Sequence, residues 1–152
     1  MTKYLLDTNI TSTIGKDSHD GYRLLGKLSN LNDDDTVSVS ILTLYESNYG
    51  LKNTNNETQK LEIAQNINFL QRNFDIIPLD LKEMEIYADL KVAYKKLTGI
   101  TRKEAKKNDL DLLIASTSIA EDATLVSNDK IFQTISKIDN RLKYENWLES
   151  KY

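Results

Sequence analysis

Short strand-like segments alternate with longer segments of helical hydrophobic spacing along this chain of 152 residues. The strand-like segments are residues 3–6 (KYLL), 36–40 (TVSVS), 76–79 (IIPL) and 123–127 (ATLVS), with a last extended piece at 142–147. Helical spacing covers residues 18–30, 40–50, 61–74, 84–97 and 108–119, and a short helix contains Phe132. Such alternation places helices on both faces of a parallel sheet. The chain is therefore predicted to form one α/β domain over residues 1–152, with a central, mainly parallel sheet.

Several signals mark the ends of these helices. Ser40 and Asn108 stand where a helix N-cap is expected, and Gly50 and Gly99 stand where helices are expected to stop. The polar residues at 53–56 and 98–108 are predicted to be loops.

Composition limits the chemistry that is open to the chain. It contains no cysteine, which excludes disulfides, thiolate metal sites and cysteine nucleophiles and is typical of a reducing cytosol. The single histidine, His19, lies in a polar stretch and argues against histidine-based catalysis. The longest central stretch without charge, residues 36–45, is half of what a membrane span needs. We expect a cytoplasmic protein without membrane contact.

Four acidic residues stand where parallel α/β sheets place their sites, beyond the carboxyl ends of strands. Asp7 ends the first strand-like segment and Asp129 follows ATLVS, while Glu46 and Asp111 lie in the helices that begin near Ser40 and Asn108. Four carboxylates in one pocket require cations or protons to offset their repulsion. Mg²⁺ and Mn²⁺ prefer oxygen ligands, so the pattern predicts a site for one or two such ions.

Each acid also has a structural explanation. Asp7 could cap the next turn, Glu46 could be an exposed helix residue, and Asp129 could be a turn residue. Asp111 stands three residues after Asn108 and could belong to a capping box. Asp109 could share the role given to Asp111, although the motif spacing favours Asp111.

A basic block precedes this acidic pair. Seven basic residues lie between positions 91 and 107, namely Lys91, Lys95, Lys96, Arg102, Lys103, Lys106 and Lys107, with a single acid, Glu104. A solvated helix surface explains such a block, and so does a contact with the phosphates of a nucleic acid. Lys103, Lys106 and Lys107 are the candidates for binding RNA.

Four motifs together resemble the PIN-domain ribonucleases, and within them the VapC-type toxins. They are YLLDTNI with Asp7, SVSILTLYESNYG with Glu46, DLLIASTSIA with Asp111 and TLVSNDKIF with Asp129. They stand in the family's order and extend from residue 3 to about 132.

The resemblance implies an α/β/α sandwich and a metal-dependent endoribonuclease of a type II toxin–antitoxin pair. Asp7, Glu46, Asp111 and Asp129 would form the catalytic, Mg²⁺- or Mn²⁺-binding pocket, supported by Asn9 and Ser127, with Thr8 and Asn128 as further candidates. Water activated by the metal would hydrolyse an RNA phosphodiester. A small antitoxin would silence the enzyme by reaching into the acidic groove, and the toxin would be a homodimer.

Other functions remain open. A haloacid-dehalogenase-type phosphatase needs a second acid two residues after the first, where this chain has Asn9. A PIN nuclease outside a toxin pair, acting on precursor RNA or on DNA, would keep the same pocket. A non-cleaving PIN-like scaffold would bind RNA or protein. Aromatic residues could support such binding, but the helical spacing of Tyr45, Tyr49, Tyr87 and Tyr94 favours core packing.

Overall fold

The computed structural model describes residues 1–99 and 102–149, except for the side chains of Arg102 and Ala105. Residues 100, 101 and 150–152 of the predicted domain, and the Arg102 side chain of the basic block, lie outside what is described. The strands are β1 (Lys3–Leu6), β2 (Thr36–Ser40), β3 (Asp75–Ile77), β4 (Thr124–Val126) and β5 (Lys143–Glu145). The helices are α1 (Thr8–Thr11), α2 (His19–Ser29), α3 (Ile41–Asn53), α4 (Glu57–Asn73), α5 (Glu83–Thr98), α6 (Arg102–Ala105), the 3₁₀ turn η1 (Lys106–Asn108), α7 (Asp109–Ala120) and α8 (Lys130–Ile138).

The five strands form one sheet in the order β3-β2-β1-β4-β5, and every neighbouring pair is parallel. This confirms the predicted α/β class. The chain builds outward from β1 in one direction through β2 and β3, and then returns to the other side of β1 for β4 and β5. The carboxyl ends of β1 and β4 therefore flank a topological switch point, where open α/β sheets form their sites.

Adjacent residues of one strand face opposite layers of helices. Leu5 packs into a cluster with residues of α5, α7 and α8, whereas Leu6 packs with residues of α1, α2 and α4. Leu125 and Val126 of β4 divide in the same way, as expected from the two-residue period of a strand. All four side chains are fully buried, so the sheet is the middle layer of a three-layer sandwich.

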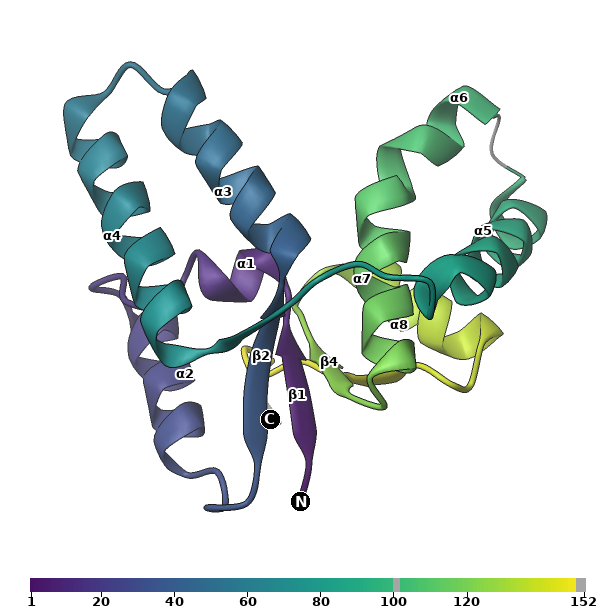
Figure 1. The fold of residues 1–152 in the computed structure, drawn as a ribbon, viewed down its shortest axis with the longest axis horizontal. Coiled ribbons are helices and arrows are strands. Elements are labelled where there is room, and N and C mark those ends of the chain that lie inside the picture. The colour runs from purple at the N-terminus through teal and green to yellow at the C-terminus, as the bar shows by residue number, and fades with distance from the viewer. Residues whose placement is uncertain (100–101, 150–152) are drawn as a thin grey trace.

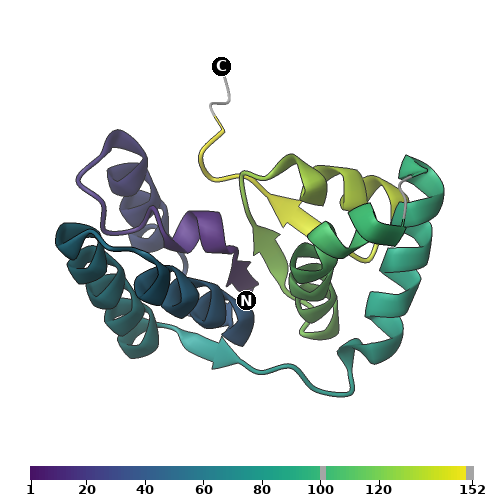
Figure 2. The same ribbon diagram turned by 90° about the horizontal axis from the view of Figure 1, so that it is seen from above.

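Two groups of helices rise beyond the carboxyl edge of the sheet (Figure 1). On one side α3 and α4 form an antiparallel pair, and on the other α5 packs along α7. The view from above shows the strands between these two groups (Figure 2). Within the described ranges, no helix is both long and apolar enough to cross a membrane.

Some helix boundaries differ from the predictions. Ser40 does cap α3, accepting a hydrogen bond from the Leu42 N–H at 3.1 Å, but the helix continues past Gly50 to Asn53. The predicted side-chain cap by Asn108 is wrong, because Asn108 ends the preceding turn η1 with φ −101° and ψ 4° and makes no capping bond. The residues at 102–108, predicted to be loop, form α6 and η1. β3 stops at Ile77 because Pro78 has no N–H for a sheet bond.

The tyrosine prediction is wrong for α3. Tyr45 and Tyr49 are 64% and 70% exposed, because α3 packs through other residues of the helix, including Leu42 and Leu44. Helical spacing shows that two residues share a face but not that the face is covered. Tyr87 and Tyr94 do pack against the core.

Candidate active site

Asp7 is held at the point where β1 turns into α1. Its N–H donates to the Val126 carbonyl at 2.9 Å, which keeps the residue beside the end of β4. Its side chain is 4% exposed. The Ser127 hydroxyl donates to Asp7 Oδ2 at 2.8 Å. A neutral donor, rather than a lysine or arginine, therefore holds this buried acid.

Ser127 connects the ends of the two central strands. Besides donating to Asp7, its hydroxyl oxygen accepts a hydrogen bond from the Asp129 N–H at 3.0 Å. Asp129 in turn caps α8 by accepting from the Ile131 N–H at 3.1 Å. The structural explanation made Asp129 a turn residue, whereas it is the N-cap of α8, and the same residue also lines the pocket described next.

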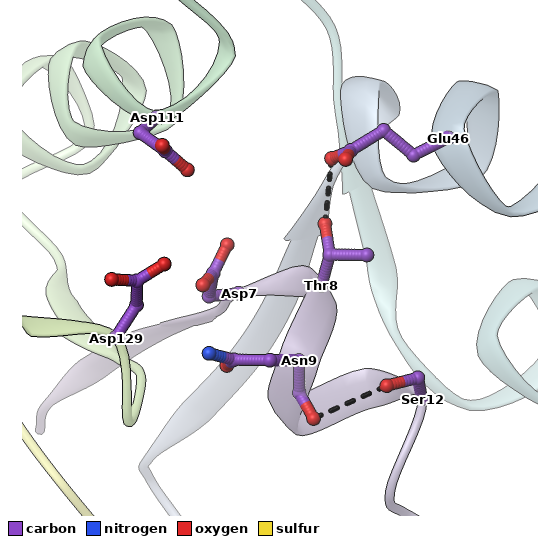
Figure 3. A pocket seen from close by; sticks show the side chains of 7 residues that line it. All are labelled: Asp7, Thr8, Asn9, Ser12, Glu46, Asp111 and Asp129. Atoms are coloured by element: carbon purple, nitrogen blue, oxygen red, sulfur yellow. Dashed lines mark hydrogen bonds between the residues drawn. The ribbon is translucent and has the colours of Figure 1, made fainter. Parts of the chain in front are cut away.

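A pocket of about 280 Å³ lies over the switch point. Its lining consists of Asp7, Thr8, Asn9, Ser12, Glu46, Asp111 and Asp129. The carboxylates of Asp7, Asp111 and Asp129 point toward a common space, and Glu46 approaches from α3 above Thr8 (Figure 3). The structure therefore brings together all four predicted acids, from four separate parts of the chain, and no described lysine, arginine or histidine lines the pocket.

Burial and the neighbouring acids raise the pKa values of Asp7 and Asp111. Burial, followed by repulsion from Glu46 and Asp129, raises the pKa of Asp7 to about 6, although the Ser127 hydrogen bond acts in the opposite direction. Burial and then repulsion from Asp7, Asp129 and Glu46 raise the pKa of Asp111 to about 7. Near neutral pH the metal-free pocket therefore holds protons that a cation would displace.

The donor set fits a hard divalent cation. Carboxylate, hydroxyl and amide oxygens are the ligands that Mg²⁺ and Mn²⁺ prefer. In the described part of the chain, however, no three acidic or histidine side chains are arranged as a ready-made metal site. The four carboxylates thus share a pocket without meeting at one point.

The remaining predicted residues fall into two groups. Asn9 lines the pocket and Ser127 supports Asp7 from behind it. Asp109 lies outside the lining and accepts hydrogen bonds from Lys91 Nζ at 2.7 Å and the Tyr87 hydroxyl at 2.9 Å. The three candidate lysines, Lys103, Lys106 and Lys107, are exposed on α6 and η1 and do not line the pocket either.

Two polar residues of the site were not anticipated. Ser12 lines the pocket because Thr8–Thr11 form the short helix α1, which the sequence did not predict. Thr43 lies behind the pocket, and its hydroxyl is 3.2 Å from that of Thr8. Its position three residues before Glu46, on the same face of a predicted helix, is the signal that could have identified it.

Comparison with known proteins shows the family of the chain. The sequence-family model of the PIN domain matches residues 4–138 of the chain. A relative from Rickettsia felis, Ribonuclease VapC2, is 34% identical over 147 residues, which cover 95% of this chain and 97% of that protein.

Solved structures show the same fold. VapBC2 from Rickettsia felis, bound to a DNA fragment from its promoter, superposes with a TM-score of 0.74 at 28% identity and covers 96% of this chain and 99% of that chain. VapBC-1 from nontypeable Haemophilus influenzae superposes with a TM-score of 0.73 at 22% identity, covering 97% and 100% of the two chains.

The fold and the acidic pocket define an α/β protein with a carboxylate site at its switch point, and the match over residues 4–138 shows that the chain belongs to the PIN-domain family. Within this family it is similar to the VapC-type ribonuclease of Rickettsia felis. The predicted resemblance is confirmed.

Proposed function

We propose that this chain is a metal-dependent endoribonuclease and the toxin of a type II toxin–antitoxin pair. The observation that carries the proposal is a pocket lined by four carboxylates, with no cationic side chain in the lining among residues 1–99 and 103–149. The relative that is 34% identical is named a ribonuclease, and the similar structure at 28% identity is a VapBC complex.

The four acids, Asp7, Glu46, Asp111 and Asp129, would hold one or two Mg²⁺ or Mn²⁺ ions. Such an ion, when bound, polarises a phosphate and lowers the pKa of water. The chain's own residues bind and orient: Ser127 holds the Asp7 carboxylate, Thr8 holds that of Glu46, and Asp111 places its carboxylate in the pocket from the first turn of α7. Among the residues that the structure describes, no lysine or histidine lines the pocket, and the proposed hydrolysis has water as its nucleophile.

We place the RNA backbone along α6 and η1, where Lys103, Lys106 and Lys107 are exposed just before α7. Replacing all three with glutamine should weaken RNA binding and reduce the dependence of log K on log salt by up to about two, since single strands contribute about 0.7 per phosphate contact. Replacing Lys16, Lys27 and Lys137, which belong to other parts of the chain, is the matched control. An unchanged salt slope would mean that the α6–η1 lysines do not contact RNA.

The proposed protein partners are a second copy of the chain and a small antitoxin. A pocket with four acids and no cation attracts a cationic side chain, so we expect the antitoxin to place an arginine or lysine there. The location in the cytoplasm stays a prediction.

The test is cleavage of a labelled total-RNA pool by wild type and Asp7→Asn, each with Mg²⁺, with Mn²⁺ and with EDTA. We expect metal-dependent cutting by the wild type and none by the variant. Equal cutting by the variant, or cutting in EDTA, would contradict the proposal. Growth arrest on expression in bacteria, absent for Asp7→Asn, tests the toxin role, and harmless wild-type expression would favour a nuclease outside a toxin pair.

A further inference from the structure

A buried threonine that does not line the pocket is connected to it through a chain of hydroxyl groups. Thr43 is fully buried in α3, and its Oγ1 lies 3.2 Å from Thr8 Oγ1 in α1. The Thr8 hydroxyl in turn donates to Glu46 Oε1 at 2.8 Å. Glu46 stands one turn after Thr43 on the same helix.

The direction of these bonds follows from the acceptor at the end. A carboxylate only accepts, so Thr8 uses its one hydroxyl proton on Glu46. Thr43 must then be the donor to Thr8. The chain runs from Thr43 through Thr8 to Glu46, and each bond polarises the next.

The hydroxyl of Thr43 bonds outside its own helix. Ser116 and Thr117, both buried inside α7, donate to the carbonyls four residues earlier, those of Leu112 at 2.6 Å and Leu113 at 3.1 Å. Thr43 is the third residue of α3, so the residue four positions before it lies in β2, and its hydroxyl pairs with that of Thr8 in α1.

Thr8 lines the pocket, and its hydroxyl donates to Glu46. This bond orients the Glu46 carboxylate, and Thr43, as the donor to Thr8, favours the rotamer of Thr8 in which the bond forms.

We propose that Thr43 is a positioning residue for the metal site: through Thr8 it holds the Glu46 carboxylate in the orientation in which the pocket binds a divalent cation. This inference rests on the proposed function for its metal. Groups that orient metal ligands from behind typically change ion affinity about 10–100-fold when removed, and Thr43 acts one bond further back.

The experiment measures Mn²⁺ binding by calorimetry, without RNA, on purified full-length protein. Thr43→Val removes the hydroxyl and keeps the shape, and we expect it to weaken Mn²⁺ binding about 3–10-fold, below the range for directly attached groups. Thr43→Ser keeps the hydroxyl and should bind as the wild type does. Thr117→Val is the matched control, because it removes an equally buried helix hydroxyl whose bond stays within α7.

A double-mutant cycle tests whether Thr43 acts on the metal site through Thr8. If Thr43 acts through Thr8, Thr8→Val with Thr43→Val should bind Mn²⁺ no more weakly than Thr8→Val alone. Melting curves identify any variant that does not fold, and Thr43→Ala then replaces Thr43→Val.

Three results would overturn the inference. They are wild-type affinity in Thr43→Val, equal weakening in Thr43→Ser, and additive losses in the cycle. If the wild type binds Mn²⁺ but cuts no RNA, the proposed function is contradicted. The Mn²⁺ affinities of the Thr43 variants then still decide this inference. Wild-type protein that binds no Mn²⁺ would overturn both.

Discussion

Two aspartates of the same helix, two residues apart, have opposite electrostatic surroundings. Asp109 accepts from Lys91 Nζ at 2.7 Å, and this bond holds the pKa of its carboxyl below the ordinary value. Burial and then the other pocket acids raise the pKa of Asp111 to about 7. Two residues of an α-helix differ by about 200° in direction, so Asp109 faces α5 and Asp111 faces the pocket. The neighbours that a residue meets, rather than its place in an acidic pair, determine its role.

The largest predicted effect is on RNA cleavage, and it tests whether Asp109 and Asp111 differ in role. Asp111→Asn should reduce metal-dependent RNA cleavage by more than about a hundredfold, because it removes a proposed ion ligand, and even groups behind such ligands typically contribute 10–100-fold. Asp109→Asn should leave cleavage unchanged, since its side chain binds Lys91 and Tyr87 outside the pocket. Initial rates with Mg²⁺ at saturating RNA measure both. Equal losses in the two variants would show that the two aspartates are not separated in role.

A second prediction concerns stability without metal. The folded-state pKa of Asp7 is about 6, above its ordinary value of 3.8, so the folded protein binds this proton more tightly than the unfolded chain. The ionised carboxylate therefore lowers stability as pH rises from about 4, and the loss is complete above about pH 7. Asp7→Asn should raise the free energy of unfolding in EDTA by about 1–3 kcal/mol at pH 8, from a shift of roughly two pKa units.

Urea denaturation at pH 8 and pH 5 measures this effect. We expect a smaller gain at pH 5, and we expect Mn²⁺ at pH 8 to stabilise the wild type but not the variant. Asp109→Asn should instead lower the free energy of unfolding at pH 8. The pKa of Asp109 is lowered in the folded protein, so its carboxylate contributes stability at pH 8 that is lost in acid. A destabilised Asp7→Asn protein at pH 8 would mean that hydrogen bonds to Asp7 outweigh the repulsion among the acids.

Much of the site could be predicted from the sequence because the carboxyl ends of the strands determine where its residues lie. Asp7 and Asp129 follow β1 and β4, and the parallel pairing of these strands brings both residues to one edge of the sheet. Glu46 and Asp111 follow from their helices, which begin at that edge. The α/β class follows from the same alternation.

The rest depends on contacts that no local pattern encodes. The hydroxyl chain from Thr43 to Thr8 exists only because α1 packs against α3. The exposure of Tyr45 depends on which side of α3 meets its neighbours. From the sequence, only the motif spacing could tell the role of Asp109 from that of Asp111. The residue that pairs with Asp109 is Lys91, which lies eighteen residues earlier on another helix.

The smallest predicted effect is on stability, and it comes from removing the charge that pairs with Asp109. Lys91→Met keeps the aliphatic stem and removes the charge, so the pKa of Asp109 should rise toward its ordinary value, while the Tyr87 hydroxyl still donates to it. The ion pair is about one-third exposed on both sides, and solvent screens such pairs, so the melting temperature should fall only slightly. Cleavage and Mn²⁺ affinity should not change, because Asp109 does not line the pocket. A loss of Mn²⁺ affinity in Lys91→Met would mean that the contact between α5 and α7 sets the position of Asp111, and the two aspartates would then form one coupled unit.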